Sequence, residues 1–262
     1  MDNRPIGFLD SGVGGLTVVR ELKRQLPHES IVYIGDSARA PYGPRPAGQI
    51  REYTWQLVKF LLTKDVKMIV IACNTATSAA CKIMRGMYPD LPLVGIEPAV
   101  KPAAQNHRGE KVAVMATPLT LHEEKFKQLV KRYENLATII PVPCPDLVEY
   151  VEKGILEGPE LEGYLKDVLK PCLQEGVKAV VLGCTHFPLV KAAIGKVVGE
   201  SVRIYDGGEG TARQAKCLLA AKNLCTDQEK GHICFESSAP EKEAYYEALY
   251  RKAAHIDSRV KL

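Results

Sequence analysis

Two cysteines stand at the same place in two closely similar passages of this sequence. Residues 66–75 read V-K-M-I-V-I-A-C-N-T and residues 177–186 read V-K-A-V-V-L-G-C-T-H, so a branched apolar run leads to Cys73 in one passage and to Cys184 in the other. A thiol can act as a nucleophile or exchange a proton with a substrate. Two equivalent thiols therefore indicate a reaction with two equivalent sides.

The residues beside these thiols are suited to proton transfer. A free thiol has a pKa near ~8.5, and polar neighbours or the start of a helix increase its thiolate fraction. We expect helices to begin directly after both cysteines, where backbone N–H groups favour a thiolate or hold a substrate carboxylate. Asp10 and His186 are the titratable residues closest to the motifs, and each can assist one thiol.

The elements that position the thiols are predicted to be buried parallel strands. A continuous run of Val, Ile and Leu is typical of a strand that is covered on both faces. In parallel α/β sheets, reacting groups collect just beyond the carboxyl ends of the strands, and that is where both cysteines stand.

The rest of the chain alternates between strands and helices, which indicates a largely parallel sheet in each half. Besides the two strands that end at the cysteines, we expect strands at residues 6–9, 30–35, 91–96, 112–116, 137–142, 202–205 and 232–236. We expect helices at about residues 16–25, 47–62, 75–87, 122–133, 146–154, 158–174, 189–199, 211–223 and 240–253.

The two halves also correspond at their first strands, which end in the hydroxyl residues Ser11 and Thr117. The sequence therefore predicts an α/β protein of two pseudo-symmetric domains, each with a largely parallel sheet flanked by helices, and an active site in the cleft between them. The chain is expected to cross near Glu97 and return near Gly207. The predicted domains are residues 1–97 plus 210–262 and residues 98–209.

Composition excludes several classes of protein. Among the 262 residues, 46% are hydrophobic and 25% charged, as in an ordinary globular enzyme, and the net charge of +4 is spread along the chain. Binding to nucleic acid needs a concentrated basic face, and none is seen. No stretch approaches the roughly 18 apolar residues of a membrane span, and the N-terminus lacks the apolar core of a secretory signal. We expect a cytoplasmic protein with no membrane partner.

The remaining cysteines carry no recognisable chemistry. No two cysteines have C-x-x-C spacing, so zinc ribbons and thioredoxin-like redox chemistry have little support. A disulfide framework is not expected in a chain of this size without an export signal. We interpret five of them as buried small hydrophobic residues, namely Cys81, Cys172, Cys217, Cys225 and Cys234. Cys144, which lies between two prolines, is expected in a turn and is assigned no role.

Four motifs together resemble those of the glutamate racemase family, within the aspartate/glutamate racemases. They are D-S-G-V-G-G-L at 10–16, P-Y-G at 41–43, A-C-N-T-A at 72–76 and G-C-T-H-F-P at 183–188. The resemblance covers essentially the whole chain in the family's order. It implies interconversion of L- and D-glutamate without a cofactor or metal, and a supply of D-glutamate for bacterial peptidoglycan.

The resemblance also implies roles for individual residues. Cys73 is the base that deprotonates D-glutamate and Cys184 the base that deprotonates L-glutamate, with Asp10 and His186 as assisting residues. The residues implied to contact the substrate are Asp10, Ser11, Tyr42, Gly43, Asn74, Thr75, Thr117, Thr120, Thr185 and His186. Asp36 and Glu152 resemble further acidic residues near the site.

Other interpretations of these residues stay open at this stage. Asp36 can be a turn-former, His186 a satisfied buried histidine, Glu152 a surface carboxylate and Tyr42 a packing residue in a Pro-rich loop. The glycine-rich turn lacks the spacing of a phosphate-binding loop, and Ser11 lacks the G-x-S-x-G context of a hydrolase nucleophile.

Rival functions also remain. No motif for a Schiff-base lysine with a phosphate site supports a pyridoxal enzyme. An aspartate racemase or a broader amino-acid racemase uses the same two-thiol chemistry, and a non-catalytic amino-acid-binding protein is the rival from another class. A homodimer is possible.

Overall fold

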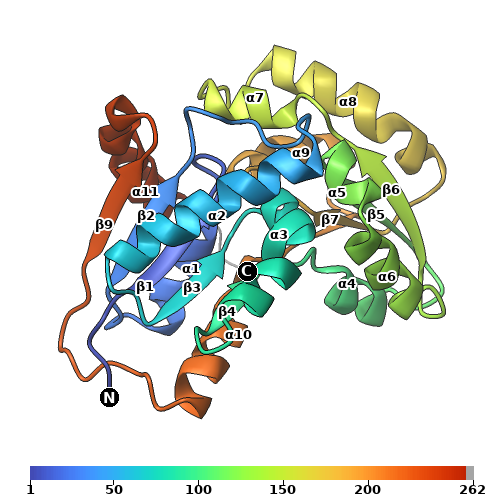
Figure 1. Ribbon diagram of the computed structural model, residues 1–262. Helices are drawn as coiled ribbons and strands as arrows, with labels where there is room; N and C mark the ends of the chain where they lie inside the picture. Colours follow the sequence, from blue (N-terminus) through green and yellow to red (C-terminus); the bar gives the residue numbers. More distant parts are fainter. Residues whose placement is uncertain (258–262) are drawn as a thin grey trace.

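The computed structural model describes residues 1–257, with side chains described as far as Arg251. Two parallel sheets lie side by side, each covered by helices on both faces (Figure 1). We call each sheet with its helices a domain. The predicted fold class, α/β with two related domains, is confirmed. No helix of the described residues is long and apolar enough to cross a membrane.

The first sheet combines strands from both ends of the chain. Its order is β4-β3-β1-β2-β9 and every pairing is parallel. The strands are β1 (Ile6–Asp10), β2 (Ile31–Gly35), β3 (Met68–Ile71), β4 (Leu93–Gly95) and β9 (Ile233–Ser237). In Figure 1 the red β9 lies beside the blue β2, so the C-terminal segment completes the N-terminal sheet.

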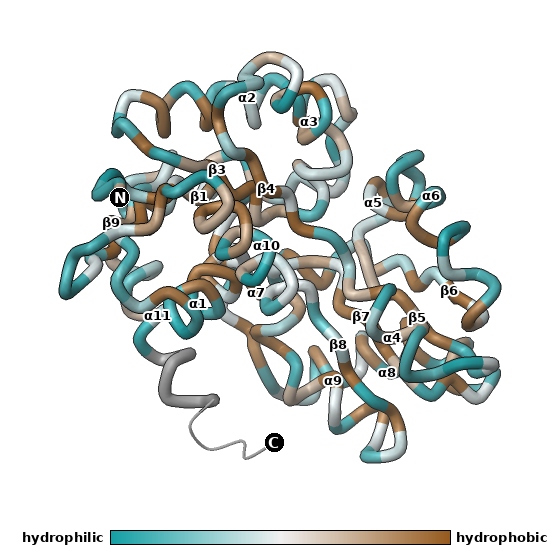
Figure 2. Tube along the Cα trace, turned by 90° about the horizontal axis from the view of Figure 1, so that it is seen from below, coloured by the Kyte–Doolittle hydropathy of each residue, from teal (hydrophilic) through white to brown (hydrophobic). Residues whose placement is uncertain are grey.

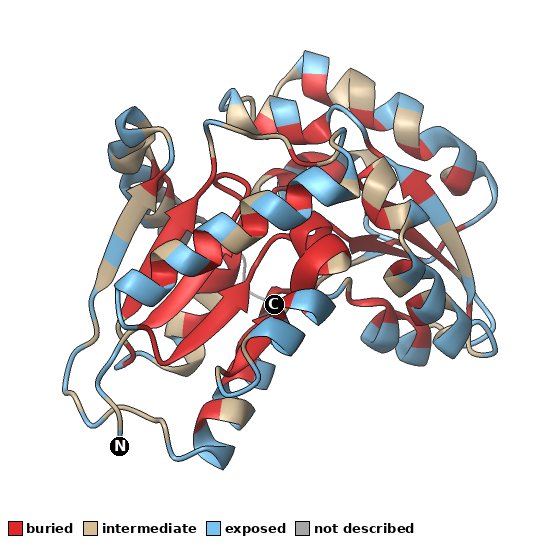
Figure 3. Cartoon of the chain, viewed as in Figure 1, coloured by how far each residue is buried: buried red, intermediate tan, exposed pale blue. Residues whose placement is uncertain are grey.

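Helices cover both faces of this sheet. Phe8 and Tyr33 face one core with α1, α10 and α11, whereas Leu9 and Ile34 face the other core with α2 and α3. The helices are α1 (Leu16–Gln25), α2 (Ala47–Thr63), α3 (Asn74–Met87), α10 (Gly208–Ala221), the 3-10 helix η2 (Pro240–Lys242) and α11 (Glu243–Asp257). Figure 3 shows the central strands almost wholly buried and the outer helix faces exposed.

The second sheet is formed by one continuous part of the chain. Its parallel order is β6-β5-β7-β8. The strands are β5 (Lys111–Ala116), β6 (Thr138–Pro143), β7 (Ala179–Leu182) and β8 (Arg203–Asp206). This order matches β4-β3-β1-β2 when each strand is replaced by its counterpart, which is the predicted pseudo-symmetry.

Helices also cover both faces of the second sheet, and hydrophobic residues concentrate along the strands between them (Figure 2). Helices α4 and α6 pack on one face, and α8 and α9 on the other. The helices are α4 (Val100–Asn106), α5 (Pro118–His122), α6 (Glu124–Tyr133), α7 (Leu147–Glu152), α8 (Pro159–Gln174), η1 (Phe187–Val190) and α9 (Lys191–Val198).

Some predicted helices differ from the observed ones. Helix α4 was not expected, because the segment after Glu97 and Pro98 was interpreted as a connection. Its Pro102 lies in the first turn, where a proline is tolerated. The helix expected at 122–133 is α6, which begins at Glu124, and a separate short helix that was not expected, α5, precedes it. Thr117 begins α5, because its side chain accepts a hydrogen bond from the backbone N–H of Thr120 at 3.4 Å and proline fills the next position.

The pseudo-symmetry extends to hydrogen bonds at the strand ends. The N–H of Asp36 donates to the carbonyl of Asp10 at 3.0 Å, and the N–H of Cys144 donates to the carbonyl of Ala116 at 2.9 Å. Cys144 therefore occupies the position in the second domain that Asp36 occupies in the first. It is fully buried at the end of β6.

The chain passes between the domains at two places that lie side by side. A Cβ atom at Gly207 would overlap the carbonyl oxygen of Glu97 and would lie 3.1 Å from a side-chain carbon of Ile96. The outgoing connection after β4 and the returning one before α10 therefore touch. The boundaries 1–97 plus 210–262 and 98–209 stay a prediction, and residues 258–262 lie outside the described residues.

Candidate active site

The predicted site residues meet where the carboxyl ends of strands in the two sheets face each other. Cys73 follows β3 by two residues and Cys184 follows β7 by two residues, as the sequence predicted. Both thiols are buried, with exposures of 5% and 7%. The two cysteines are therefore largely shielded from bulk water on opposite sides of the boundary between the domains.

Cys73 lies at the start of a helix. It is the N-cap of α3, and its Sγ accepts a hydrogen bond from the N–H of Ala76 at 3.4 Å and donates to the Oγ of Ser11 at 3.6 Å. Burial nevertheless raises the pKa of Cys73 to about 12, and the negative charge of Asp10 adds to this increase. At neutral pH this thiol therefore holds its proton.

Asp10 is the last residue of β1 and is fully buried. Its Oδ1 accepts a hydrogen bond from the N–H of Gly12 at 3.0 Å, and its Oδ2 accepts one from the Oγ1 of Thr185 at 2.9 Å. Burial raises the pKa of Asp10, although the charge of His186 and these two hydrogen bonds lower it. The net effect of these surroundings raises the pKa of the carboxyl group above its ordinary value.

Cys184 has a different partner. Its Sγ lies 3.7 Å from the Nδ1 of His186, and the Nε2 of that ring lies 2.7 Å from the Oε1 of Glu152. Burial by itself lowers the pKa of His186, but the hydrogen bonds to Cys184 and Glu152 outweigh it and the pKa lies well above 6.5. Burial raises the pKa of Glu152, but the hydrogen bond and charge of His186, with the N–H of Val13, lower it by more. The pKa of Glu152 is therefore below its ordinary value. The pair is therefore an imidazolium beside a carboxylate.

The prediction that a helix begins directly after each thiol is right for Cys73 and wrong for Cys184. Thr185 and His186 form a turn, the 3-10 helix η1 begins at Phe187, and α9 begins at Lys191. The second thiol therefore has a histidine as its partner where the first has a helix N-terminus.

Three threonine hydroxyls meet at the boundary between the domains. The Oγ1 of Thr75 lies 3.0 Å from that of Thr117 and 3.2 Å from that of Thr120, and the last two lie 3.0 Å apart. Thr75 belongs to α3, whereas Thr117 and Thr120 belong to the start of α5. Hydroxyl groups in such a cluster can donate to a carboxylate or bond to one another.

The loop after β2 carries Asp36 and Tyr42. The hydroxyl of Tyr42 donates to the carboxylate of Asp36, and the Nε of Arg39 lies 2.7 Å from the same carboxylate. Both oxygens of Asp36 are therefore occupied by partners on its own loop. A Cβ atom at Gly43 would lie 3.0 Å from the Cβ of Thr117, so this loop reaches the second domain.

Asn74 presents an acceptor to the same region. Its side chain is buried, and its Oδ1 has no hydrogen-bond partner among the described residues. A buried amide oxygen without a donor is unfavourable on its own and is suited to an ammonium or N–H donor.

Three further contacts were not predicted from the sequence, and two of them cross the boundary between the domains. The N–H of Val13 donates to the Oε1 of Glu152 at 3.0 Å, and the Oγ1 of Thr17 lies 3.3 Å from the carbonyl of Thr185. The hydroxyl of Tyr33 donates to the carbonyl of Gly12 at 2.5 Å. The only signal for these contacts was the glycine-rich turn itself, which allows another chain to approach closely.

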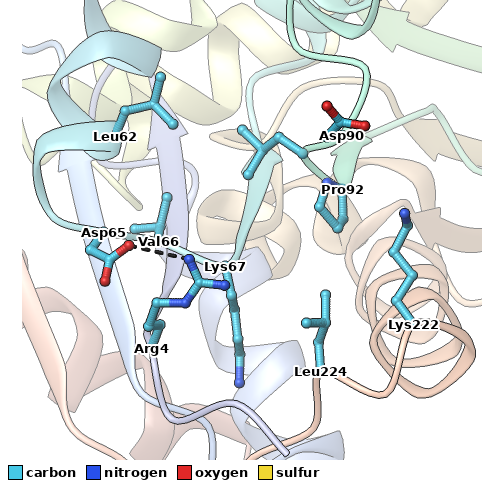
Figure 4. A pocket seen from close by; sticks show the side chains of 10 residues that line it. Arg4, Leu62, Asp65, Val66, Lys67, Asp90, Pro92, Lys222 and Leu224 are labelled. Carbon is cyan, nitrogen blue, oxygen red and sulfur yellow. Dashed lines mark hydrogen bonds and ion pairs between the residues drawn. The ribbon is translucent and has the colours of Figure 1, made fainter.

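An open pocket among the described residues lies away from the thiols. It has a volume of about 520 Å³ and is lined by Arg4, Lys67 and Pro92, which precede β1, β3 and β4 (Figure 4). It therefore lies at the amino ends of the strands, opposite the thiols. Within the part of the chain that the structure describes, no three His, Cys, Asp or Glu side chains are arranged to hold a metal ion.

Known proteins that are similar to this chain are racemases. The family model Asp/Glu/Hydantoin racemase matches residues 6–215. The chain is 48% identical over 230 residues to a glutamate racemase of Clostridium novyi, covering 87% of this chain and 89% of the relative.

Solved structures agree as well. A glutamate racemase of Francisella tularensis in complex with D-glutamate superposes with a TM-score of 0.83, at 32% identity, over 96% of this chain and 95% of that one. The Escherichia coli glutamate racemase in complex with L-glutamate and the activator UDP-MurNAc-ala gives a TM-score of 0.82 at 30% identity, over 95% of each chain.

Proposed function

Because the chain belongs to the Asp/Glu/hydantoin racemase family, we propose that it interconverts L- and D-glutamate by moving the Cα proton between two thiols. The observation that carries the proposal is the pair of buried thiols on equivalent strand ends, each with its own assisting group. Asp10 and Ser11 accompany Cys73, and His186 with Glu152 accompanies Cys184. A racemisation that removes the Cα proton from one face and delivers a proton to the opposite face uses such a pair.

The resemblance assigns a direction to each thiol, and the proton that Cys73 holds is consistent with its role. With L-glutamate, the Sγ of Cys184 removes the Cα proton while His186 holds a proton beside it, and the thiol of Cys73 delivers its own proton to the opposite face of the carbanion. Cys184 is then a thiol and Cys73 a thiolate. One proton is removed from Cα and one is delivered to it, so the substrate neither gains nor loses a proton over one turnover. D-glutamate reacts by the reverse transfer.

The intermediate must be stabilised inside a dry site. A carbanion next to a carboxylate carries charge that preorganised donors stabilise. We infer that the hydroxyls of Thr75, Thr117 and Thr120 and the loop of Tyr42 and Gly43 bind the carboxylates of glutamate. The free oxygen of Asn74 is assigned to the substrate ammonium group.

Two rival functions make different demands on the site. An aspartate racemase would use the same thiols with a shorter substrate, and the relatives named above are glutamate racemases. A non-catalytic amino-acid-binding protein has no use for two opposed thiols with separate acid–base partners. The geometry therefore favours the enzyme.

The wider setting is also part of the proposal. The product suits bacterial peptidoglycan, which contains D-glutamate, and the reaction is assigned to the cytoplasm with no cofactor, metal, nucleic acid or membrane. A homodimer is proposed from the resemblance, and sedimentation equilibrium measures it directly.

The test is a polarimetric assay of the purified protein with each enantiomer of glutamate and aspartate. Both glutamate enantiomers should approach the racemate, and aspartate should react far more slowly. Activity should survive dialysis against a chelator and treatment with hydroxylamine, which removes carbonyl cofactors. Activity that disappears and returns with pyridoxal phosphate would overturn the cofactor-independent mechanism.

A further inference from the structure

Tyr33 is a fully buried residue of β2 whose hydroxyl reaches the turn after β1. The hydroxyl donates to the carbonyl of Gly12 at 2.5 Å. The ring packs edge-on against Tyr246 of α11, with centroids 5.7 Å apart and an interplanar angle of 84°. Burial, and next the charge of Asp10, raise the pKa of Tyr33 well above 10, so it is a permanent donor.

The peptide group that Tyr33 holds is also held from the other domain. Its carbonyl belongs to Gly12 and its N–H belongs to Val13, and that N–H donates to the Oε1 of Glu152 at 3.0 Å. A Cβ atom at Gly12 would overlap the carboxylate of Glu152, so the close approach requires glycine. A bond to the carbonyl also polarises the N–H on the same peptide.

The same carboxylate oxygen of Glu152 accepts a hydrogen bond from His186. The Nε2 of that histidine lies 2.7 Å from Oε1, and its Nδ1 lies 3.7 Å from the Sγ of Cys184. A continuous series of hydrogen bonds therefore runs from Tyr33 in the core of the first domain, through one peptide group and Glu152, to the second thiol.

From this series we propose that Tyr33 is a positioning residue for the Cys184 side of the reaction. Tyr33 orients the peptide group between Gly12 and Val13, and this peptide group holds the carboxylate of Glu152. Glu152 in turn orients the imidazole ring of His186 beside the thiol of Cys184. The inference rests on the proposed racemase function. The Cys73 side of the reaction should not depend on Tyr33. Its assisting residue, Asp10, accepts a hydrogen bond from the N–H of Gly12, which belongs to the preceding peptide group.

Tyr33→Phe is the direct test, because it removes one buried hydroxyl and keeps the ring. The readout is elimination of chloride from each enantiomer of a glutamate with chlorine at Cβ, which needs only one base. We expect elimination from the L enantiomer, assigned to Cys184, to fall about threefold to tenfold, the range for one hydrogen bond. Elimination from the D enantiomer should stay within about twofold of the wild type.

Tyr246→Phe is the matched control. It removes the neighbouring buried hydroxyl, which bonds to Ser37 and Ser237 and not to Gly12, and it leaves the same aromatic pair. This variant should keep the wild-type ratio of L to D elimination. If Tyr33→Phe lowers both enantiomers equally, or if Tyr246→Phe changes the ratio as much, Tyr33 is merely structural and the proposal fails.

The pH profile provides a readout that packing alone does not move. With Glu152 less firmly held, His186 should lose its proton more readily, so the alkaline limb of the L profile should move to lower pH in Tyr33→Phe. An unchanged limb together with an unchanged ratio would overturn the proposal. Failure of the racemase function itself is distinguishable, because the wild type would then eliminate from neither enantiomer.

Discussion

The Oγ1 of Thr185 lies 2.9 Å from the Oδ2 of Asp10, so the residue after the second thiol donates a hydrogen bond to the carboxylate that assists the first. The bond crosses the boundary between the domains. It joins the two halves of the site through a residue that is fully buried and costly to ionise. The first prediction follows from that cost.

Asp10→Asn should make the protein more stable and less active. Burial raises the pKa of Asp10 above its ordinary value of 3.8, so the folded state binds a proton more tightly than the unfolded state. Stability contributed by this group is therefore lost as pH rises from that value through the folded pKa. We expect the variant to melt at a higher temperature than the wild type at about pH 7.5, with the difference vanishing near pH 4.

Calorimetry across this pH range measures the difference, and Asp36→Asn is the control. Asp36 is also buried but is paired with Arg39, so neutralising it should not stabilise the protein. An Asp10→Asn variant that is less stable than the wild type at neutral pH would contradict the prediction. Its racemase activity should fall about a hundredfold or more, as expected for loss of an acid–base group.

Cys73→Ser and Cys184→Ser should each nearly abolish racemisation, because each removes the base for one face of Cα. A reacting group must approach its target to about 3–3.5 Å, so two thiols that flank one carbon act from opposite sides. Each variant should retain elimination from one enantiomer of β-chloroglutamate, in opposite senses. The prediction of burial is right for Cys81 and Cys172 but wrong for Cys217 and Cys234, which are exposed, and Cys225 is half-buried. Cys217→Ser therefore changes an exposed thiol and should leave both reactions unaltered. Loss of the same enantiomer in both variants would refute the assignment of one thiol to each face.

Thr117→Val should weaken selection of glutamate over aspartate. The change removes a hydroxyl from the cluster with Thr75 and Thr120, and a buried polar group without its partner is costly. We expect kcat/KM for glutamate to fall about tenfold to a hundredfold, and that for aspartate much less. Thr138→Val, at an exposed position of β6, is the control. An equal fall in kcat/KM for glutamate and aspartate would show that the three threonines do not determine specificity.

Gly207→Ala should impair closure of the domains. We expect the two connections between the domains to act as hinges when glutamate binds. The added methyl group would overlap the carbonyl of Glu97 and force these connections apart. Wild-type protein should become more compact and exchange fewer amide hydrogens at these connections when glutamate binds, and the variant should show smaller changes and a lower kcat. Gly210→Ala is the control, since its Cβ would meet only the Arg213 side chain, at 4.0 Å. If small-angle scattering and hydrogen exchange of the wild type do not respond to glutamate, the site is preformed.

Lys67→Met should destabilise the first domain without touching the site. The Nζ of Lys67 lies 2.6 Å from the Oε2 of Glu29 and both side chains are almost fully buried. Removing one partner leaves a buried charge, which typically costs about 3–5 kcal/mol. Lys111→Met, which breaks an exposed pair with Glu175, should cost about 1 kcal/mol or less. Urea denaturation measures the free energy of unfolding of both variants. Similar losses in Lys67→Met and Lys111→Met would mean that the pair of Lys67 and Glu29 is hydrated.

The sequence was sufficient for the parts of the site that depend on local pattern. Apolar runs predicted the strands, and their ends predicted where Cys73 and Cys184 stand. The pairing of His186 with Glu152 could not be predicted, because it depends on how α7 packs against η1, which follows His186. The same holds for Val13, whose contact with Glu152 arises only when the two domains meet, and for Tyr33, whose contact depends on how the turn after β1 lies against β2. Cys144 was expected in a turn, and its correspondence to Asp36 became visible only through the hydrogen bonds at the strand ends.

Strand β9 has a consequence for how the protein is made. The second sheet takes all four strands from residues 111–206, whereas the first sheet needs residues 233–237 beside β2. On the ribosome, the N-terminal segment therefore emerges first with an unpaired edge at β2, and the segment synthesised after it has its full set of strands sooner. A nascent chain stalled before Ile233 would hold a complete second sheet behind an unfinished first one, so the half that is translated first is the half that finishes folding last.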